Sequence, residues 1–209
     1  MIVDGVIALI IAYLLGSIPS AYIVTRLATG KDIRQLGSGN VGGNNVFQQV
    51  GLIAAIPVAI FDVGKGATAV AIAHWLLGAP PLFLLAAGLA VVAGHMWSIF
   101  LKFTGGNGLA PTIGVLSILM TKELLIVFAM TLLLIVVTRN VVLSVNISLL
   151  SVPVSAWFLE KSWLLVIFSI VLALILVVNF IPTARAALAQ AGNKENLLAE
   201  LLRSNKAKR

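Results

Sequence analysis

The stretch VDGVIALIIAYLLGSIPSAYIVTR, residues 3–26, decides the class of fold. It is apolar over a length that matches the roughly 20 residues a helix needs to cross a bilayer. Asp4 stands where a signal peptide would carry basic residues, and further apolar stretches follow it. We therefore expect a retained membrane-spanning helix rather than a signal peptide.

The composition of the whole chain agrees with a membrane protein. Of its 209 residues 60% are hydrophobic and only 10% are charged, whereas soluble domains carry about 25% charged residues. Cysteine is absent and there are two histidines, so we expect no disulfide, no metal centre and no cofactor. The net charge of +7 is interpreted as a topology signal and as affinity for anionic membrane lipid, not for nucleic acid.

Charges and loop residues divide the chain into seven apolar segments. The predicted fold is an all-α integral membrane bundle of about seven transmembrane helices, with a membrane domain over residues 1–182 and a basic cytoplasmic tail over 183–209. The segments lie near residues 3–26, 50–78, 81–101, 108–121, 123–138, 140–158 and 162–181.

The basic residues between the segments predict the orientation. With the N-terminus outside, only Lys122 and Lys161 lie in the outer loops. The positive-inside rule therefore favours an external N-terminus and a cytoplasmic C-terminus. The basic residues on the cytoplasmic side are Arg26, Lys31, Arg34, Lys102, Arg139, Arg185, Lys194, Arg203, Lys206, Lys208 and Arg209.

This orientation brings two glycine-rich segments to the cytoplasmic face. They are GSGNVGGNNVFQQ, residues 37–49, and LKFTGGNGLAPT, residues 101–112. Glycine lets backbone N–H groups converge on one point, and such a nest binds phosphate, above all where a helix begins. We expect the two segments to pack together around a small polar pocket; the simpler alternative is a pair of flexible turns.

A third polar segment, FDVGKGATA at residues 61–69, lies inside the second apolar stretch. Asp62 and Lys65 are three residues apart and share one face of a helix. A charge inside the bilayer costs about 2.5–3.5 kcal/mol, so it is normally paired or functional. The charged pair has two interpretations. Either Asp62 and Lys65 neutralise each other on their own helix, or Lys65 reaches a phosphate while Asp62 orients it. The small residues around them, including Gly64 and Gly66, suit close helix packing.

Three segments of the chain resemble one family of enzymes. GSGNVGGNN, DVGKG and GHMWSIFLKFTGGNG are similar, in order and spacing, to the bacterial acyl-phosphate glycerol-3-phosphate acyltransferases, over roughly residues 5–180. The resemblance implies a seven-span enzyme of the bacterial inner membrane. It implies transfer of a fatty acyl group from acyl phosphate to the sn-1 hydroxyl of glycerol 3-phosphate, giving lysophosphatidic acid.

The resemblance also implies roles for individual residues. Ser38 matches the serine of the first family motif, and Gly94 with His95 matches the third-span signature, so Ser38 and His95 are the expected catalytic residues. No Ser-His-Asp set is visible, and a substrate phosphate is the expected proton acceptor. A structural hydrogen bond is the favoured role for His95. The expected substrate-binding residues are Asn40, Asn45, Lys65, Lys102, Gly105, Gly106, Asn107 and Gly108.

The chain departs from the family pattern at several cationic positions. Gln48 stands at the arginine position, and Thr104 and Asn107 stand where the glycine-rich loop normally has lysines; Ser98 replaces a proline. A hydrogen bond to a charged group is worth about 1.5–3 kcal/mol. Two alternatives therefore stay open beside the expected enzyme: an acyltransferase with another acceptor, or an impaired paralogue that binds lipid. A transporter is disfavoured because the polar residues gather at one face.

Overall fold

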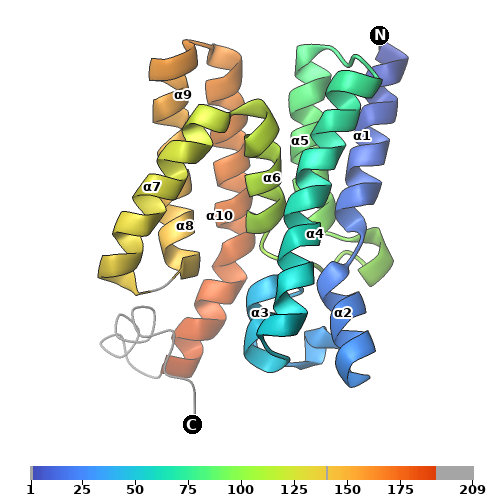
Figure 1. Ribbon diagram of the computed structural model, residues 1–209, viewed down its shortest axis with the longest axis vertical. Coiled ribbons are helices and arrows are strands. Elements are labelled where there is room, and N and C mark those ends of the chain that lie inside the picture. Colours follow the sequence, from blue (N-terminus) through green and yellow to red (C-terminus); the bar gives the residue numbers. More distant parts are fainter. Residues whose placement is uncertain (1, 140, 192–209) are drawn as a thin grey trace. The chain divides into compact units, whose positions relative to one another are not determined.

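The structure is a computed structural model that describes residues 2–139 and 141–191. These residues form helices joined by connections of different length, and the isolated bridge between Ser98 and Thr104 belongs to no strand. In lipid a helix satisfies its own backbone N–H and C=O groups, so the apolar runs of this chain favour helices. The chain divides into two compact units, Met1–Leu119 and Met120–Arg209, each described here by itself (Figure 1).

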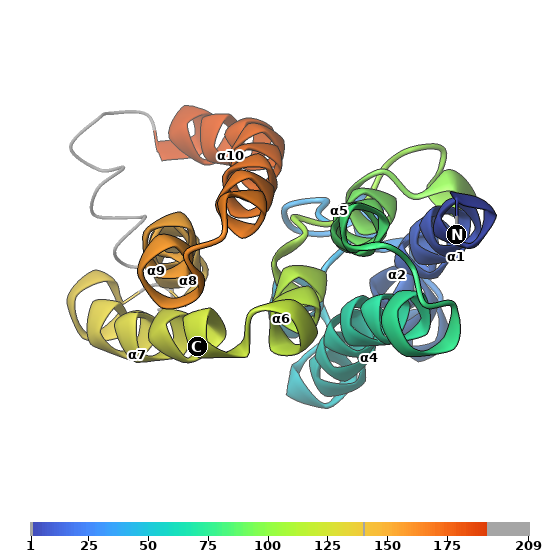
Figure 2. The ribbon, with the colours of Figure 1, turned by 90° about the horizontal axis from the view of Figure 1, so that it is seen from above.

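The first unit is arranged around helix α4. In the view from above, α4 lies beside α1 and α6 (Figure 2), and it also contacts α2, α3 and α5. Short 3-10 turns at Ile33–Gln35 and Ile99–Leu101 lie in the two long connections. The helices of this unit are α1 (Ile2–Ser17), α2 (Ser20–Thr29), α3 (Gly43–Gln49), α4 (Leu52–Ala71, continued by a π-helical turn at Ile72–Leu76), α5 (Pro81–Met96) and α6 (Leu109–Leu119).

The first apolar stretch is interrupted between α1 and α2, because Pro19 has no N–H to donate and disfavours a helical conformation at the residue before it. The interruption exposes two backbone carbonyl groups. The Ser17 carbonyl accepts a hydrogen bond from Ser98 Oγ at 2.5 Å. The Ile18 carbonyl accepts one from Lys65 Nζ at 3.1 Å. The proline therefore creates acceptors that residues of α4 and of the α5–α6 connection use.

Glycines join α1 to α5. A Cβ atom on Gly16 would overlap the Val91 carbonyl oxygen, and one on Gly94 would overlap the Tyr13 carbonyl oxygen. The two contacts are reciprocal, since each helix supplies one glycine and one carbonyl. Small residues at such positions let helix backbones approach closely, with Cα–H···O contacts between them.

The same arrangement joins α4 to α6. A Cβ atom on Gly66 would overlap the Pro111 carbonyl oxygen, and one on Gly114 would overlap the Val63 carbonyl oxygen. Gly64, two residues from Gly66, has no atom within 4 Å of the place a Cβ would take. The packing role expected for the glycines of residues 61–69 therefore belongs to Gly66.

The described part of the second unit, residues 120–139 and 141–191, contains four helices. α7 packs against α8 and α9, and α9 packs against α10. The pair α8–α9 is bent by 41° at its break, and Lys122 near the start of α7 forms an ion pair of 2.8 Å with Glu160 at the end of α9. The helices are α7 (Thr121–Thr138), α8 (Val141–Leu149), α9 (Val152–Glu160) and α10 (Trp163–Ala191).

The all-helical prediction is confirmed for the described residues, and each of the seven apolar segments contains a helix or a pair of helices. Among the described residues four helical segments, the first of which combines α1 and α2, are long and apolar enough to cross a membrane, or five if the bent pair is one span. At 1.5 Å per residue, α5 and α6 measure about 24 and 16 Å, less than the roughly 30 Å of a hydrocarbon core. The count of seven spans stays a prediction. α10 continues past residue 182 to Ala191, and residues 192–209 of the predicted tail lie outside the described residues.

Candidate active site

The first glycine-rich loop is organised by Asn45, whose side chain is buried at 1% exposure. Its Oδ1 accepts a hydrogen bond from the Ser38 backbone N–H at 3.3 Å. Its Nδ2 donates to the carbonyl groups of Leu36 and Asn40, both at 3.0 Å, and lies 3.4 Å from that of Ile33. The carboxamide is thus engaged with the loop backbone, so Asn45 supports the loop and does not present its side chain to a ligand.

The predicted catalytic residue Ser38 lies at the surface of this loop. Its neighbours Gly37 and Gly39 have φ angles of 52° and 72°, which are left-handed conformations that glycine adopts without strain. The Ser38 side chain is exposed, and its Oγ lies 3.4 Å from the Asn40 backbone N. Asn40 is half-buried, and Gln48 is exposed on α3.

The second glycine-rich loop lies directly against the first. The Val41 backbone N–H donates to the Gly105 carbonyl at 3.3 Å, and the Gly106 N–H donates to the His95 carbonyl at 3.1 Å. A Cβ on Gly106 would overlap His95 Nε2 and would lie 2.6 Å from the Val41 carbonyl oxygen. The structure therefore brings residues 37–49 and 101–112 together, and glycine is required at 106 because His95 and Val41 leave no room for a side chain.

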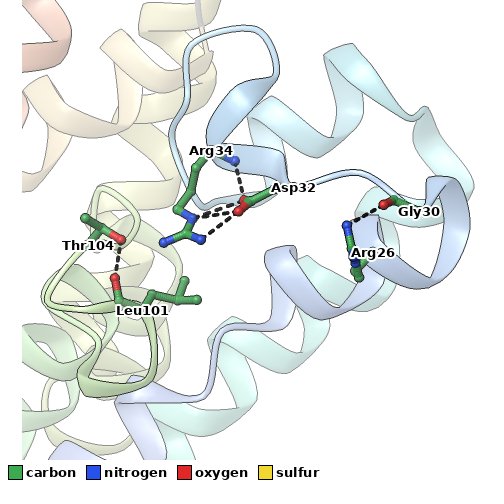
Figure 3. A network of polar contacts seen from close by, with 6 residues as sticks. All are labelled: Arg26, Gly30, Asp32, Arg34, Leu101 and Thr104. Atoms are coloured by element: carbon green, nitrogen blue, oxygen red, sulfur yellow. Dashed lines mark hydrogen bonds and ion pairs between the residues drawn. The ribbon is translucent and has the colours of Figure 1, made fainter.

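The other predicted residues of this loop have different surroundings. Lys102 is exposed and has a left-handed φ of 55°. Thr104 is also exposed, and its hydroxyl donates to the Leu101 carbonyl at 2.6 Å (Figure 3). Asn107 is half-buried, and Gly108, with φ of 83°, immediately precedes α6. These positions border the start of α6, where backbone N–H groups are available to an anion.

Behind Gly106 lies a buried polar cluster formed by Ser20, Asp62, Lys65 and His95. Asp62 Oδ1 accepts from Ser20 Oγ at 2.7 Å and forms an ion pair with Lys65 Nζ at 2.8 Å. Lys65 Nζ lies 2.8 Å from His95 Nδ1. The Asp62 and Lys65 side chains are only 1% and 2% exposed, so this is a desolvated network that joins α2, α4 and α5.

The ammonium group of Lys65 is fully engaged in this cluster. Its three acceptors are Asp62 Oδ1, His95 Nδ1 and the Ile18 carbonyl. A phosphate contact by Lys65, as predicted from the sequence, would require one of these bonds to break. The spacing of Asp62 and Lys65 identified the pair, but it gave no indication of Ser20 or His95, which are 42 and 30 residues away from their partners.

Two arginines, Arg26 near the end of α2 and Arg34 in the connection to α3, are also held in place (Figure 3). Arg34 forms an ion pair with Asp32 at 2.6 Å, and its guanidinium lies 5.6 Å from the centre of the Tyr22 ring. This guanidinium lowers the pKa of the Asp32 carboxyl through hydrogen bonds. Arg26 Nη1 donates to the Gly30 carbonyl at 2.5 Å. Sequence reasoning used both arginines only as topology signals.

The fold and the site together define the class of protein. It is a helical membrane protein whose polar site is built from two glycine-rich loops. Within residues 2–139 and 141–191, no group of three or more His, Asp or Glu side chains could hold a metal ion. The family model described as glycerol-3-phosphate acyltransferase matches residues 6–190. The chain belongs to the glycerol-3-phosphate acyltransferase family.

Individual relatives agree with this assignment. Glycerol-3-phosphate acyltransferase 1 of Dehalococcoides mccartyi is 39% identical over 198 residues, which cover 92% of this chain and 95% of the relative. Glycerol-3-phosphate acyltransferase 2 of Moorella thermoacetica is 38% identical over 188 residues, 90% of this chain and 96% of the relative.

A solved structure shares the fold. The crystal structure of PlsY (YgiH), an integral membrane glycerol 3-phosphate acyltransferase, in its glycerol 3-phosphate form superposes with a TM-score of 0.81 at 29% identity. The superposition covers 89% of this chain and 92% of that one. The expected family and its all-helical integral membrane architecture are thus confirmed.

Proposed function

We propose that this chain transfers a fatty acyl group from acyl phosphate to glycerol 3-phosphate and forms lysophosphatidic acid. The observation that carries the proposal is the contact of the two glycine-rich loops at Val41 and Gly105, with His95 directly behind Gly106. Membership of the glycerol-3-phosphate acyltransferase family supplies the reaction.

The chemistry needs little from the protein beyond positioning and charge stabilisation. The glycerol hydroxyl oxygen attacks the acyl carbonyl carbon, the bond from that carbon to the phosphate oxygen breaks, and the departing phosphate takes the hydroxyl proton. Backbone N–H groups of Gly105, Asn107 and Gly108 hold phosphate oxygens at the start of α6, while the Gly106 N–H stays bonded to the His95 carbonyl. Ser38 and Asn40 orient the acceptor, and Lys102 contributes positive charge at the rim. Asn45 maintains the loop that carries them.

The reaction takes place at the cytoplasmic face of a bacterial inner membrane. In this arrangement the chain crosses the bilayer seven times, and the acyl chain of the donor lies among membrane lipids while both phosphates remain at the glycine-rich loops. The apolar helices and the basic connections support this arrangement.

Restoring the missing family charges tests the proposal. The triple variant Gln48→Arg, Thr104→Lys and Asn107→Lys adds three cations next to the glycine-rich loops, and positions 48 and 104 are exposed. Since each charged hydrogen bond is worth about 1.5–3 kcal/mol, KM for glycerol 3-phosphate should fall roughly tenfold or more. Asn107→Lys alone should recover part of this effect. The measurement is the rate of acyl transfer against acceptor concentration in purified protein.

Leu27→Arg is the control, because it adds the same charge at a position of α2 that is 83% exposed and belongs to neither glycine-rich loop. It should leave KM close to that of the wild type. Glycerol as a competing acceptor tests whether a phosphate is needed at all. If wild type and all variants fold in detergent but transfer no acyl group to either acceptor, the enzymatic proposal is wrong and the chain is a binding relative.

A further inference from the structure

We propose that Lys65 is a positioning residue that fixes the proton of the His95 imidazole on Nε2 and thereby makes His95 a hydrogen-bond donor toward a substrate oxygen at Gly106. The proposal rests on the proposed function for the identity of the substrate oxygen. The arrangement of Lys65 and His95 itself is independent of any substrate.

Lys65 carries its ammonium group into the buried polar cluster. An ammonium group has three N–H donors and no acceptor. All three have partners: Asp62 Oδ1 at 2.8 Å, His95 Nδ1 at 2.8 Å and the Ile18 carbonyl at 3.1 Å. Asp62 is held in turn by Ser20 Oγ at 2.7 Å. Lys65 therefore approaches His95 as a donor in a fixed orientation.

A ring nitrogen that accepts a hydrogen bond carries no proton. His95 Nδ1 accepts from Lys65, so the proton of the neutral imidazole is on Nε2. The alternative is donation from Nδ1 to Asp62 Oδ1. That distance is 3.5 Å, at the limit of a hydrogen bond, and the ammonium lies closer at 2.8 Å. The Nε2–H tautomer is therefore the one that satisfies the whole cluster.

The Nε2–H group points into the glycine-rich loop. A Cβ on Gly106 would overlap Nε2, so this nitrogen lies directly against the Gly106 backbone of the second glycine-rich loop. Within the described residues the structure gives Nε2 no hydrogen-bond partner. A donor that is held in place next to backbone N–H groups is suited to stabilising negative charge on a phosphate or carbonyl oxygen.

The Nε2–H tautomer excludes His95 as a general base and makes it a hydrogen-bond donor. A protonated Nε2 cannot take the proton of the attacking hydroxyl, so His95 does not act as the general base. It donates a hydrogen bond instead, and the hydroxyl proton passes to the departing phosphate. Lys65 contributes to catalysis only through His95, at a distance from the substrate.

The tautomer can be read directly by NMR. The chain has only two histidines, His74 and His95, and His74 is exposed, so it provides an internal reference. In protein labelled with 15N-histidine, His95 should show an unprotonated Nδ1 and a protonated Nε2 in the wild type. A wild-type spectrum with a protonated Nδ1 would overturn the proposal without any variant.

Lys65→Met removes the ammonium and keeps the unbranched side chain. We expect the His95 spectrum to lose its single tautomer and kcat to fall at least tenfold, with KM for glycerol 3-phosphate changed less than threefold, because one well-placed donor is worth roughly 100-fold or more in rate. Lys31→Met, the same change at an exposed lysine, should alter neither quantity. An unchanged His95 spectrum in Lys65→Met would overturn the proposal.

Two further variants separate positioning from folding. Lys65→Met leaves Asp62 as an unpaired buried charge, which is destabilising; adding Asp62→Asn removes that charge and should restore the folded yield but not kcat. His95→Gln keeps an N–H donor that needs no tautomer, so Lys65→Met should cost little more in that background. Recovery of kcat in the Lys65→Met, Asp62→Asn variant would reduce Lys65 to a structural residue. A wild type that shows the expected spectrum but no acyl transfer would count against the proposed function alone.

Discussion

The Asn45 carboxamide supplies hydrogen bonds that the backbone of residues 33–40 cannot make within itself. Its oxygen faces the Ser38 N–H group, and its nitrogen faces the carbonyl groups of Leu36 and Asn40. This set of partners assigns the two ends of the amide unambiguously. One buried side chain thus holds Ser38 and Asn40 at the loop surface.

Replacing Asn45 with Asp tests this role with almost no change in shape. The carboxylate keeps an acceptor for Ser38 but places negative charge against two carbonyl groups that have lost their donor. We expect the free energy of unfolding to fall by about 1–3 kcal/mol and acyl transfer to drop with it. The measurement is thermal unfolding in detergent alongside the transfer rate.

Asn44→Asp provides the control, because the neighbouring Asn44 is exposed and surface substitutions usually change stability by less than about 0.5 kcal/mol. Equal stabilities of the two variants would show that the Asn45 bonds do not hold the loop.

The sequence predicted the polar residues of the site better than their roles. Glycine content identified both loops, because few residues other than glycine accept φ near 52° or tolerate a histidine ring at Gly106. The roles of Asn45 and Lys65 could not be predicted, because each depends on which partners the fold brings within 3 Å. In the structure Asn45 forms hydrogen bonds with the loop backbone, and Lys65 forms one with His95.

At the scale of helices, the first unit depends on two reciprocal glycine contacts. Gly66 and Gly114 join α4 to α6, and Gly16 and Gly94 join α1 to α5. The packing of α4 and α5 matters for the site because these helices carry Asp62, Lys65 and His95. Each glycine contact fixes a helix that carries part of the cluster, α4 or α5, against a neighbouring helix.

Gly66→Ala and Gly64→Ala are the same substitution at two positions of α4, of which residue 66 is tightly packed and residue 64 is not. At residue 66 the new methyl group would overlap the Pro111 carbonyl, and overpacking of this kind costs about 1–3 kcal/mol. At residue 64 nothing lies within 4 Å, and alanine favours a helix by up to about 1 kcal/mol. Thermal unfolding of both variants should therefore move in opposite directions; a Gly66→Ala variant as stable as Gly64→Ala would contradict the close contact.

At the scale of the whole molecule, the distribution of basic residues predicts the orientation in the membrane. The excess of basic residues on one side predicts an external N-terminus and a cytoplasmic C-terminus. A reporter that is active only in the cytoplasm should give signal at the C-terminus and none at the N-terminus. Signal at both ends would contradict an odd number of spans.

The seven apolar segments were predictable because each is bounded by charges or by glycine and proline, as at Pro81, the first residue of α5. The breaks inside these segments were not predictable from the sequence. Hydropathy averages over many residues, so it does not register the interruption at Pro19 or the bend between α8 and α9. The short α5 and α6 also show that an apolar run can be longer than its helix, because residues 97–108 continue into the site.

The ion pair of Asp62 and Lys65 has a consequence for how the protein is made. Both residues are on α4, at positions i and i+3, so they can neutralise one another before any other helix is present. The nascent α4 therefore leaves the insertion machinery as an overall neutral segment, and it does not have to wait for His95, which is synthesised thirty residues later. A pair divided between two helices would instead expose one isolated charge to lipid during that interval, at a cost of about 2.5–3.5 kcal/mol.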